Sequence, residues 1–378
     1  MSAITVEEAD AIQPAQVRMT PPSRFGDKAF YWLTLSMAFA VVLLVILIGW
    51  ELGQGSWQAI QKFGFHFLTR STWDPVAEEF GSLPFIYGTA ISSLIALIIA
   101  VPLSIATAVY LTELAPLWIR QPIISLIEML AAIPSVILGL WGIFVMIPWL
   151  RDYPFPFLQK LLGWTPFFGG PIYGPCVLAG GIIVAIMILP IITSVSREIL
   201  RSVPDLQREA AYALGATRWE VTRIAVLSYA RKGLFGAVIL GLGRALGETM
   251  AVTMVIGNTP QIAASLFKPG YTLASVIANE FTEATTDMYL QALFEIGLVL
   301  FGVTILVNLL AQLLLKTIPQ AQRQGEFNKH ADPAQRPSQL AQVQERAHLR
   351  ADVLFRGPCD RAARSRIFSR TQKRSGCG

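Results

Sequence analysis

Charged residues are scarce in this chain of 378 residues. Asp, Glu, Lys and Arg together make up 15% of it, whereas a soluble domain carries about 25%. Hydrophobic residues reach 53%, and the mean hydropathy is +0.52. This balance excludes an ordinary soluble domain and predicts an all-α polytopic membrane protein, because long apolar runs cross a bilayer as helices. The net charge of +5 does not indicate nucleic-acid binding, since many basic residues lie beside apolar runs or near the C-terminus.

Cysteine and the short motifs of catalysis are equally sparse. The three cysteines, Cys176, Cys359 and Cys377, have neither a CxxC spacing nor a histidine partner. They therefore predict no metal site and no disulfide framework. The sequence also lacks the P-loop pattern GxxxxGK followed by Ser or Thr, and it lacks HExxH and GxSxG. We therefore expect no enzymatic activity, no metal and no cofactor here, and no binding of ATP by a P-loop of this chain.

Six apolar runs are long enough to span a membrane, since about 20 residues cross the hydrocarbon core. They lie at about 29–50, 86–111, 123–150, 176–195, 233–257 and 290–315. Together they predict a transmembrane domain over residues 29–320. Residues 1–28 are polar and predict a cytoplasmic N-terminal arm without a cleavable signal peptide.

Basic residues determine the expected orientation of these spans. The loop 196–232 holds seven of them, whereas the connectors 51–85, 151–175 and 258–289 hold about one or two each. Under the positive-inside rule, this loop is cytoplasmic. An even number of spans then places both termini in the cytoplasm as well. The seven residues are Arg197, Arg201, Arg208, Arg218, Arg223, Arg231 and Lys232.

Local signals in the loop 196–232 predict two short helices around a glycine. Pro204 and Asp205 suit the first turn of the first helix, and Gly215 suits a left-handed stop. Thr217-Arg-Trp-Glu220 has the spacing of a capping box, which begins a second helix. From this pattern alone, a surface helical hairpin without a partner stays open as the alternative.

Two opposite charges fall in the middle of the fifth apolar run. Arg244 and Glu248 are four residues apart, so a continuous helix would project both from one face, together with Gly241. Charges at such depth are costly and mark transport pathways or proton relays. We take Arg244, Glu248 and Thr249 as the candidate substrate pathway. The alternative is an ion pair that locks the helix and touches no substrate.

Other residues in the spans have a functional and a structural interpretation. Glu128, near the inner end of the third run, lines the pathway or reaches the membrane interface. Ser135 follows Pro134, which breaks the helical hydrogen bonding. Either the backbone N–H groups freed there face an anion, or the proline only kinks the helix. Gly243 and Gly247 form a small-residue pair that lets another helix approach closely. Glu280, in an outer connector, is expected to be solvated or to dock a partner.

The cytoplasmic loop resembles a known motif. Glu209, Ala210 and Ala211, followed by Gly215, look like the EAA loop of ABC importer permeases. In that family the loop is a coupling helix that docks on a cytoplasmic ATPase. Ala225 and Ser228 depart from the Ile-x-Leu-Pro pattern that follows the glycine there.

Three further stretches, at 241–252, 128–142 and 278–281, resemble the C-type permease of bacterial high-affinity phosphate (Pst) importers. This resemblance covers residues 28 to 320. It implies a type I ABC importer permease fold in the bacterial inner (plasma) membrane, with phosphate as the substrate. It also implies a sister A-type permease, two copies of a cytoplasmic ABC ATPase and a periplasmic phosphate-binding protein as partners, with lipid around the spans and no nucleic acid.

Several alternatives remain at this point. The substrate could be another oxyanion, such as molybdate or sulfate, or the chain could be an ion-coupled secondary transporter that uses Arg244 and Glu248 as a proton relay. A membrane enzyme of phospholipid synthesis is disfavoured, because no paired-aspartate metal motif is present. Residues 321–378 lie outside the resemblance and predict a basic, disordered cytoplasmic tail without a function. The other explanation of this tail is translation past an original stop or a frameshift.

Overall fold

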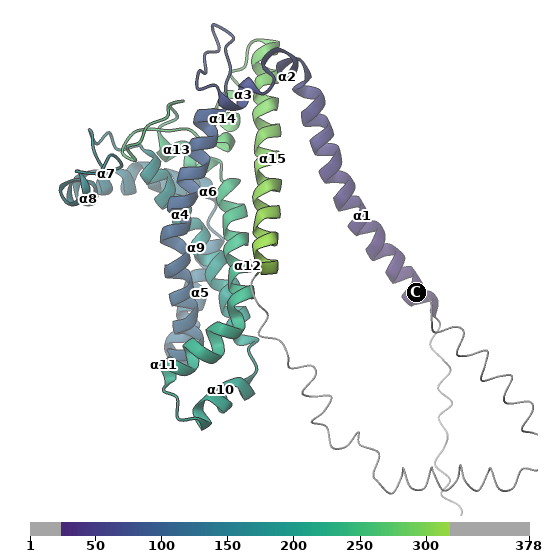
Figure 1. The fold of residues 1–378 in the computed structure, drawn as a ribbon, viewed down its shortest axis with the longest axis vertical. Coiled ribbons are helices and arrows are strands. Elements are labelled where there is room, and N and C mark those ends of the chain that lie inside the picture. The colour runs from purple at the N-terminus through teal and green to yellow at the C-terminus, as the bar shows by residue number, and fades with distance from the viewer. Residues whose placement is uncertain (1–23, 318–378) are drawn as a thin grey trace, which may run out of the picture. The chain divides into compact units, whose positions relative to one another are not determined.

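Helices make up all the regular structure that is described for this protein. A computed structural model describes residues 24–317, and within them the only β-pairing is an isolated bridge between Asp74 and Glu79 (Figure 1). The expected all-α class is therefore confirmed. Residues 1–23 of the predicted arm and the whole predicted tail, 321–378, lie outside the described residues.

Six helical runs in the described part are long and apolar enough to cross a membrane, which confirms a multi-pass membrane protein. Three are single helices and three contain a π-helical turn. The single helices are α1 (Arg24–Gly55), α9 (Val177–Arg201) and α15 (Asp287–Thr317). The others are α4 (Leu83–Val109) with η2 (Tyr110–Leu114); α6 (Ser135–Trp141), η3 (Gly142–Met146) and α7 (Ile147–Asp152); and α11 (Arg218–Val221), η4 (Thr222–Val226) and α12 (Leu227–Leu246).

Helix α9 is the helix on which α4 and α12 both pack, and the three run side by side in Figure 1. In its apolar stretch, 72% of the residues are buried within the chain, against 33% in α4. Glycine allows this close packing. A Cβ added at Gly181 of α9 would lie 2.5 Å from Ile95 of α4, and one at Gly241 of α12 would lie 2.6 Å from Ile192 of α9.

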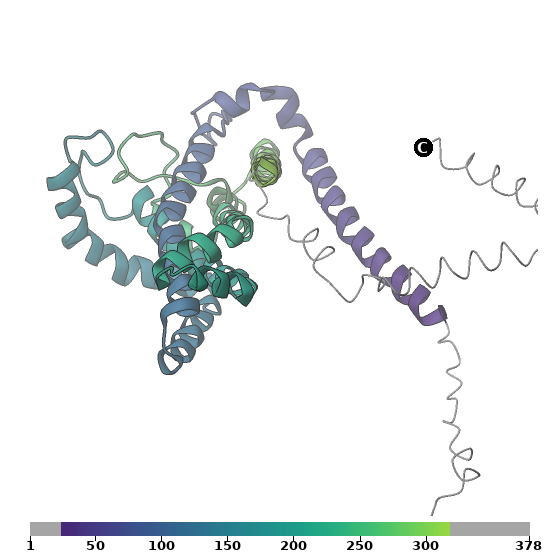
Figure 2. The same ribbon diagram turned by 60° about the horizontal axis from the view of Figure 1, so that its bottom comes forward.

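Helix α1 packs on the rest of the described chain through α15, which Figure 2 shows nearly end-on in yellow-green. A Cβ added at Gly49 would lie 3.2 Å from the Phe301 ring, and one at Gly55 would lie 3.0 Å from Phe294. Most large apolar side chains of α1 are exposed within this chain. Such a surface suits a helix that is surrounded by lipid or by another transmembrane subunit.

Shorter helices occupy the ends of this helical bundle or lie beside it. Figure 1 shows α10 at one end, and α2, α3 and α14 at the opposite end. The shorter helices are α2 (Trp57–Phe63), α3 (His66–Thr69), α5 (Leu117–Ala131), α8 (Pro154–Leu162), α10 (Asp205–Ala213), α13 (Met250–Ile256) and α14 (Leu273–Glu280).

Two of the expected spans differ from the observed helices. The run 123–150 is divided at residues 132–134 into α5 and the helices that begin at Ser135, as the sequence break at Pro134 indicates. The run 233–257 was expected to be one continuous helix, and here the structure corrects the prediction. Helix α12 begins earlier, at Leu227, and ends at Leu246, and α13 follows after a break. Glu248 therefore lies between the two helices and not on the helix that carries Arg244.

The three connectors with few basic residues meet at the α14 end. Ser265 Oγ donates to the Gly169 carbonyl at 2.6 Å, which joins the connector after α13 to the one after α7. Trp73 Nε1 donates to Glu280 Oε2 at 2.8 Å, which joins the first connector to α14. The Arg-rich loop lies at the opposite end, with α10. The structure thus places the segments on the same two sides that the distribution of basic residues predicts.

An aromatic cluster holds the α14 end together. Trp73 lies in T-shaped contact with Phe80 and Phe85, with ring centroids 4.9 Å apart in each pair. Edge-to-face pairs of this kind add about 0.5–1.5 kcal/mol beyond the burial of their area. The buried members of the cluster are Phe67, Phe80, Phe85, Tyr271, Leu273, Val276, Tyr289, Ala292, Leu293 and Ile296.

Gly88 is the point of closest approach between α4 and this end of the molecule. A Cβ added there would lie 2.1 Å from the Tyr271 carbonyl oxygen, which is a backbone atom and cannot turn away. We expect Gly88→Ala to lower the free energy of unfolding by roughly 1–3 kcal/mol, as overpacking does. The thermal unfolding of the detergent-solubilised protein measures this effect.

Gly302 of α15 provides the matched control for Gly88. A Cβ added at Gly302 meets no atom within 4 Å among the described residues. Gly302→Ala should leave the unfolding temperature unchanged or raise it slightly, because alanine is the better helix former. Equal unfolding temperatures for the two variants would contradict the tight contact at Gly88.

Candidate functional site

The candidate pathway residues lie at the break between α12 and α13. Arg244 lies in the last turn of α12, and residues Gly247 to Thr249 separate that helix from α13. The half-buried Thr249 donates from Oγ1 to the Gly247 carbonyl at 3.1 Å. A broken helix at membrane depth leaves backbone groups that need partners, and such breaks occur where they are buried in protein or line a cavity.

Arg244 and Glu248 are brought together in spite of the break. The distance from Arg244 Nη2 to Glu248 Oε2 is 3.8 Å, which is an ion pair but is too long for a hydrogen bond. The side chain of Glu248 is 6% exposed and that of Arg244 is 46% exposed. The carboxylate is thus buried, whereas nearly half of the Arg244 side chain is exposed within the described chain.

The glycines around Arg244 differ in their surroundings. Gly241, which helical spacing places on the face of Arg244, is buried against Ile192 of α9 and is the glycine that allows close packing. A Cβ added at Gly243 meets no atom within 4 Å in the described chain, and one at Gly247 meets only the Gly243 carbonyl, at 3.7 Å. Within residues 24–317, the Gly243 and Gly247 pair therefore packs against no other helix. Together with Arg244 it forms an open surface.

Ser135 lies at the same level as this break. Gly139 of α6 is close to Ala251 and Met254 of α13, with 3.1 Å from an added Cβ to the Ala251 Cα. Gly142, three residues later, is close to Val255. The two helices therefore run parallel, and Ser135, at the start of α6, lies at the end where α13 begins. Two breaks in the membrane helices thus come together beside Glu248.

Glu128 is placed elsewhere. It lies on α5, and its Oε1 accepts from Arg197 Nη2 of α9 at 3.4 Å. The Glu128 side chain is 60% exposed and that of Arg197 is 15% exposed. No contact joins Glu128 to Arg244 or Glu248 in the described residues. The structure therefore gives Glu128 an ion-pair partner that the sequence pattern did not indicate.

The candidate coupling residues lie on α10 and in the turn after it. Glu209 and Ala210 are exposed on the outer face of α10, and Ala211 is half-buried. Gly215 has a φ of +82°, which confirms the left-handed stop. The capping box of Thr217 and Glu220 is also present, with Thr217 N donating to Glu220 Oε2 at 2.8 Å.

Large apolar side chains gather on the outward surface of this loop. Outside the membrane spans, apolar side chains so exposed indicate a surface that a partner covers. Those on α10, on α11 and in the turn between them are Leu206, Tyr212, Leu214 and Trp219. The sequence pattern alone did not select them, because their exposure depends on how α10 packs.

Glu280 corrects a further expectation. It was expected to be solvated or to dock a partner, yet its Oε2 accepts from Trp73 Nε1 at 2.8 Å and from Tyr289 Oη at 2.7 Å. Its neighbour Asn279 donates to Tyr271 Oη at 2.9 Å. Both residues thus serve the packing of the α14 end. The partners are up to 207 positions away in the sequence, so no local pattern could have found them.

Comparison with known proteins gives consistent similarities. Residues 100–323 match the family described as binding-protein-dependent transport system inner membrane component. The chain is 48% identical over 296 residues to the phosphate transport system permease protein PstC of Mesorhizobium japonicum, covering 77% of this chain and 90% of that protein. It is 46% identical to the protein of the same name from Haemophilus influenzae, covering 78% of this chain and 94% of that protein.

A solved structure is similar in fold. A bacterial alginate ABC transporter, in complex with an alginate-bound periplasmic protein, contains a chain that aligns with a TM-score of 0.51 at 16% identity. The alignment covers 76% of this chain and 96% of that one. These similarities confirm the resemblance that the sequence motifs indicate, and the chain belongs to the family of binding-protein-dependent transport system inner membrane components, grouping within it with the PstC permeases.

Proposed function

We propose that this chain is the membrane-spanning permease subunit of an ATP-driven importer that moves inorganic phosphate across the bacterial inner membrane. The observation that carries the proposal is the 48% identity to a phosphate transport permease over nearly the whole transmembrane domain. Proteins of this family are transport subunits and not enzymes, which agrees with the expectation from the sequence.

Such a permease acts with an ATPase and a substrate-binding protein. We place the ATPase at the α10 end, because Glu209, Gly215 and the exposed apolar residues of that loop form an uncovered surface there. The binding protein then docks at the opposite end, where the three connectors meet. This assignment makes the α10 end cytoplasmic and agrees with the positive-inside rule. It places both termini in the cytoplasm.

The sister A-type permease and two copies of the ATPase complete the proposed complex. The open surface of α12 supports a second transmembrane subunit, since Gly243 and Gly247 allow another helix to approach closely. Arg244 lies on that surface, and its side chain is 46% exposed within the described chain. We therefore place the phosphate path between the two permeases, beside Arg244, Glu248 and Thr249.

The chemistry of Arg244 and Glu248 suits weak, transient binding of phosphate better than tight binding. A guanidinium offers charge and paired donors that match phosphate oxygens. Glu248, which is buried and lies 3.8 Å away, neutralises Arg244 when no anion is present and repels phosphate when it is. Arg244 then exchanges its partner between Glu248 and phosphate, and binding remains weak enough for release. The parallel starts of α6 and α13 beside Glu248 add positive backbone dipoles at the same level.

Uptake of radiolabelled phosphate by vesicles that contain the whole complex tests this function. We expect ATP-dependent accumulation of phosphate that is insensitive to a protonophore and is lost when the P-loop lysine of the ATPase is replaced. Accumulation of sulfate or molybdate in place of phosphate would support the other oxyanion importers. Uptake that persists without the ATPase and stops with the protonophore would support an ion-coupled carrier.

A further inference from the structure

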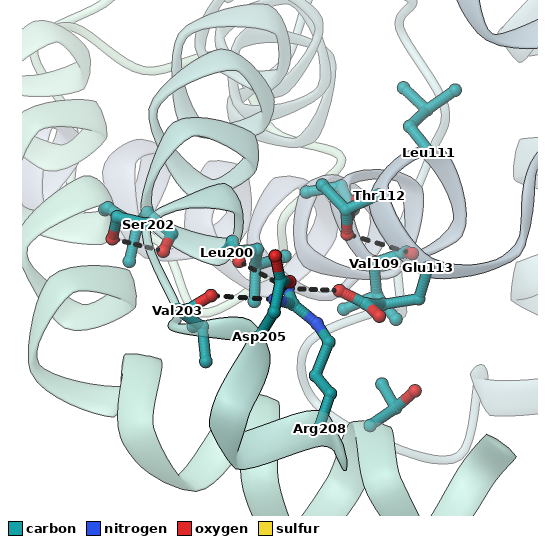
Figure 3. A network of polar contacts seen from close by, with 12 residues as sticks. Val109, Leu111, Thr112, Glu113, Leu200, Ser202, Val203, Asp205 and Arg208 are labelled. Carbon is teal, nitrogen blue, oxygen red and sulfur yellow. Dashed lines mark hydrogen bonds and ion pairs between the residues drawn. The ribbon is translucent and has the colours of Figure 1, made fainter. Parts of the chain in front are cut away.

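A second polar network lies at the α10 end, around Arg208 (Figure 3). Arg208 Nη2 donates to Glu113 Oε1 at 3.0 Å and to the Leu200 carbonyl at 3.1 Å. Arg208 Nη1 donates to the Val203 carbonyl at 2.7 Å and to Asp205 Oδ1 at 2.9 Å. One guanidinium thus joins α10 to the end of α9, to the turn between them and to η2 at the end of α4.

The Arg208 and Glu113 side chains are mostly removed from water. They are 18% and 14% exposed, whereas Asp205 is 86% exposed. Charge-assisted hydrogen bonds in such surroundings are stronger than those at an open surface. The planar guanidinium of Arg208 donates hydrogen bonds to two carbonyls and two carboxylates at once. A lysine ammonium, a point charge with three donors, does not reproduce this arrangement.

The segment that carries Glu113 is itself held in place. Arg120 of α5 donates from Nε to the Leu111 carbonyl at 2.6 Å, and from Nη2 to the Thr112 carbonyl. At the far end of α4, Thr89 Oγ1 accepts from the Leu273 backbone N–H of α14 at 2.9 Å. Helix α4 is therefore fixed at both ends, and it links the Arg208 network to the end where the connectors meet.

Arg208 lies on the inner side of α10, while Glu209 and Ala210 are exposed on its outer side. The outer side is the proposed ATPase contact, so the two sides of one short helix have separate tasks. Any tilt or shift of α10 must carry the ends of α9 and α4 with it or break the three contacts of Arg208 with residues outside α10, which are Leu200, Val203 and Glu113. The covalent connection through α11 and α12 leads to Arg244, and the Arg208 network leads to α4.

We propose that Arg208 is a positioning residue that makes α10 move as one body with the ends of α9 and α4, so that ATPase movement is transmitted to the whole permease. This inference rests on the proposed function. Without Arg208, α10 still docks on the ATPase through its outer side, but its movement reaches α9 and α4 incompletely. The complex then hydrolyses ATP with little transport.

The test measures phosphate transported per ATP hydrolysed in vesicles that hold the full complex. In Arg208→Met we expect the ATPase to co-purify and to hydrolyse ATP at the wild-type rate or faster. The transport-to-hydrolysis ratio should fall about fivefold or more, in the range of typical couplings between sites. Glu113→Gln should lower the ratio less, because the two carbonyl contacts of Arg208 remain, and Arg208→Lys should lie between wild type and Arg208→Met.

Asp205→Asn is the matched control. It weakens only the exposed contact of Arg208, so the ratio should stay at the wild-type value. The double variant Arg208→Met/Glu113→Met should show the same ratio as Arg208→Met. The contact between Arg208 and Glu113 is already lost in the single variant, so the second substitution removes nothing further. Uptake and hydrolysis that fall in proportion, or an unchanged ratio, would show that Arg208 has only a structural role.

The two conservative substitutions, Glu113→Gln and Arg208→Lys, keep the inference testable even if the Arg208→Met complex does not assemble. If Arg208→Met does not assemble, Glu113→Gln and Arg208→Lys support the same comparison, and a wild-type ratio in both would overturn the inference. A wild-type complex that accumulates no phosphate overturns the proposed function instead. The two failures are therefore distinguished by the wild-type vesicles alone.

Discussion

Arg244→Gln is expected to lower the rate of phosphate uptake at least about tenfold, while the complex still assembles. The guanidinium is 46% exposed within this chain and lies 3.8 Å from its carboxylate, so most of its donors are free for an anion. Glutamine removes the charge and the paired donors. Hydrogen bonds to charged groups contribute about 1.5–3 kcal/mol, and every 1.4 kcal/mol is a factor of about ten. The initial rate of radiolabelled phosphate uptake into vesicles measures the loss.

Glu248→Gln should affect binding in the opposite direction. The amide preserves the shape of the side chain and removes the negative charge that competes for Arg244. Phosphate should then bind more tightly and leave more slowly, so that both the apparent Kd and the maximal rate of uptake fall. Arg231→Gln serves as the control, because Arg231 lies on the same helix but is exposed, and among residues 24–317 its side chain bonds only to Ser228 Oγ, at 3.3 Å. Wild-type uptake by an assembled Arg244→Gln complex would leave the pair with only a helix-locking role.

Gly215→Val should abolish phosphate uptake and the association of the ATPase, while membrane insertion remains normal. Gly215 has a φ of +82°, a conformation in which a β-branched residue is strained by about 1–3 kcal/mol. An added Cβ there meets no atom within 4 Å in the described chain, so the strain is in the backbone and not in packing. The turn between α10 and α11 must therefore change, and the surface that contains Tyr212 and Trp219 changes with it.

Gly215→Asn provides the matched control, because asparagine tolerates the left-handed conformation. It should keep most of the uptake and co-purify with the ATPase. Glu209→Lys should also abolish uptake, since it reverses a charge on the exposed outer side of α10 without straining the turn. Normal recovery of the ATPase with Gly215→Val would show that the contact does not depend on this turn.

Local chemistry explains which features could be predicted from the sequence. The apolar runs predict six crossings, because a backbone in lipid must satisfy its own hydrogen bonds. The stop at Gly215 and the capping box from Thr217 to Glu220 depend on residues within one turn of each other. Pro134 likewise marks the break in the third run, because proline cannot donate to the preceding turn.

Features that depend on packing could not be predicted in this way. The end of α12 at Leu246 contains no proline and follows a strongly apolar pattern, so a continuous helix was the natural expectation. Gly241 and Gly243 are two residues apart, yet only Gly241 meets α9. Glu280 was misplaced for the same reason, because its hydrogen-bond donors come from a distant connector and from α15.

By itself, the sequence determined that this protein crosses a membrane six times, on which side its basic loop lies relative to its other connectors, and where α10 stops. These features depend on hydropathy, charge and residues that are close in the chain. Only the tertiary structure decided that Glu248 is buried while Arg244 is partly exposed, and that Arg208 joins α10 to α9 and α4. The first depends on the break between α12 and α13, and the second on a contact between residues 95 positions apart. No periodicity in the sequence records either of them.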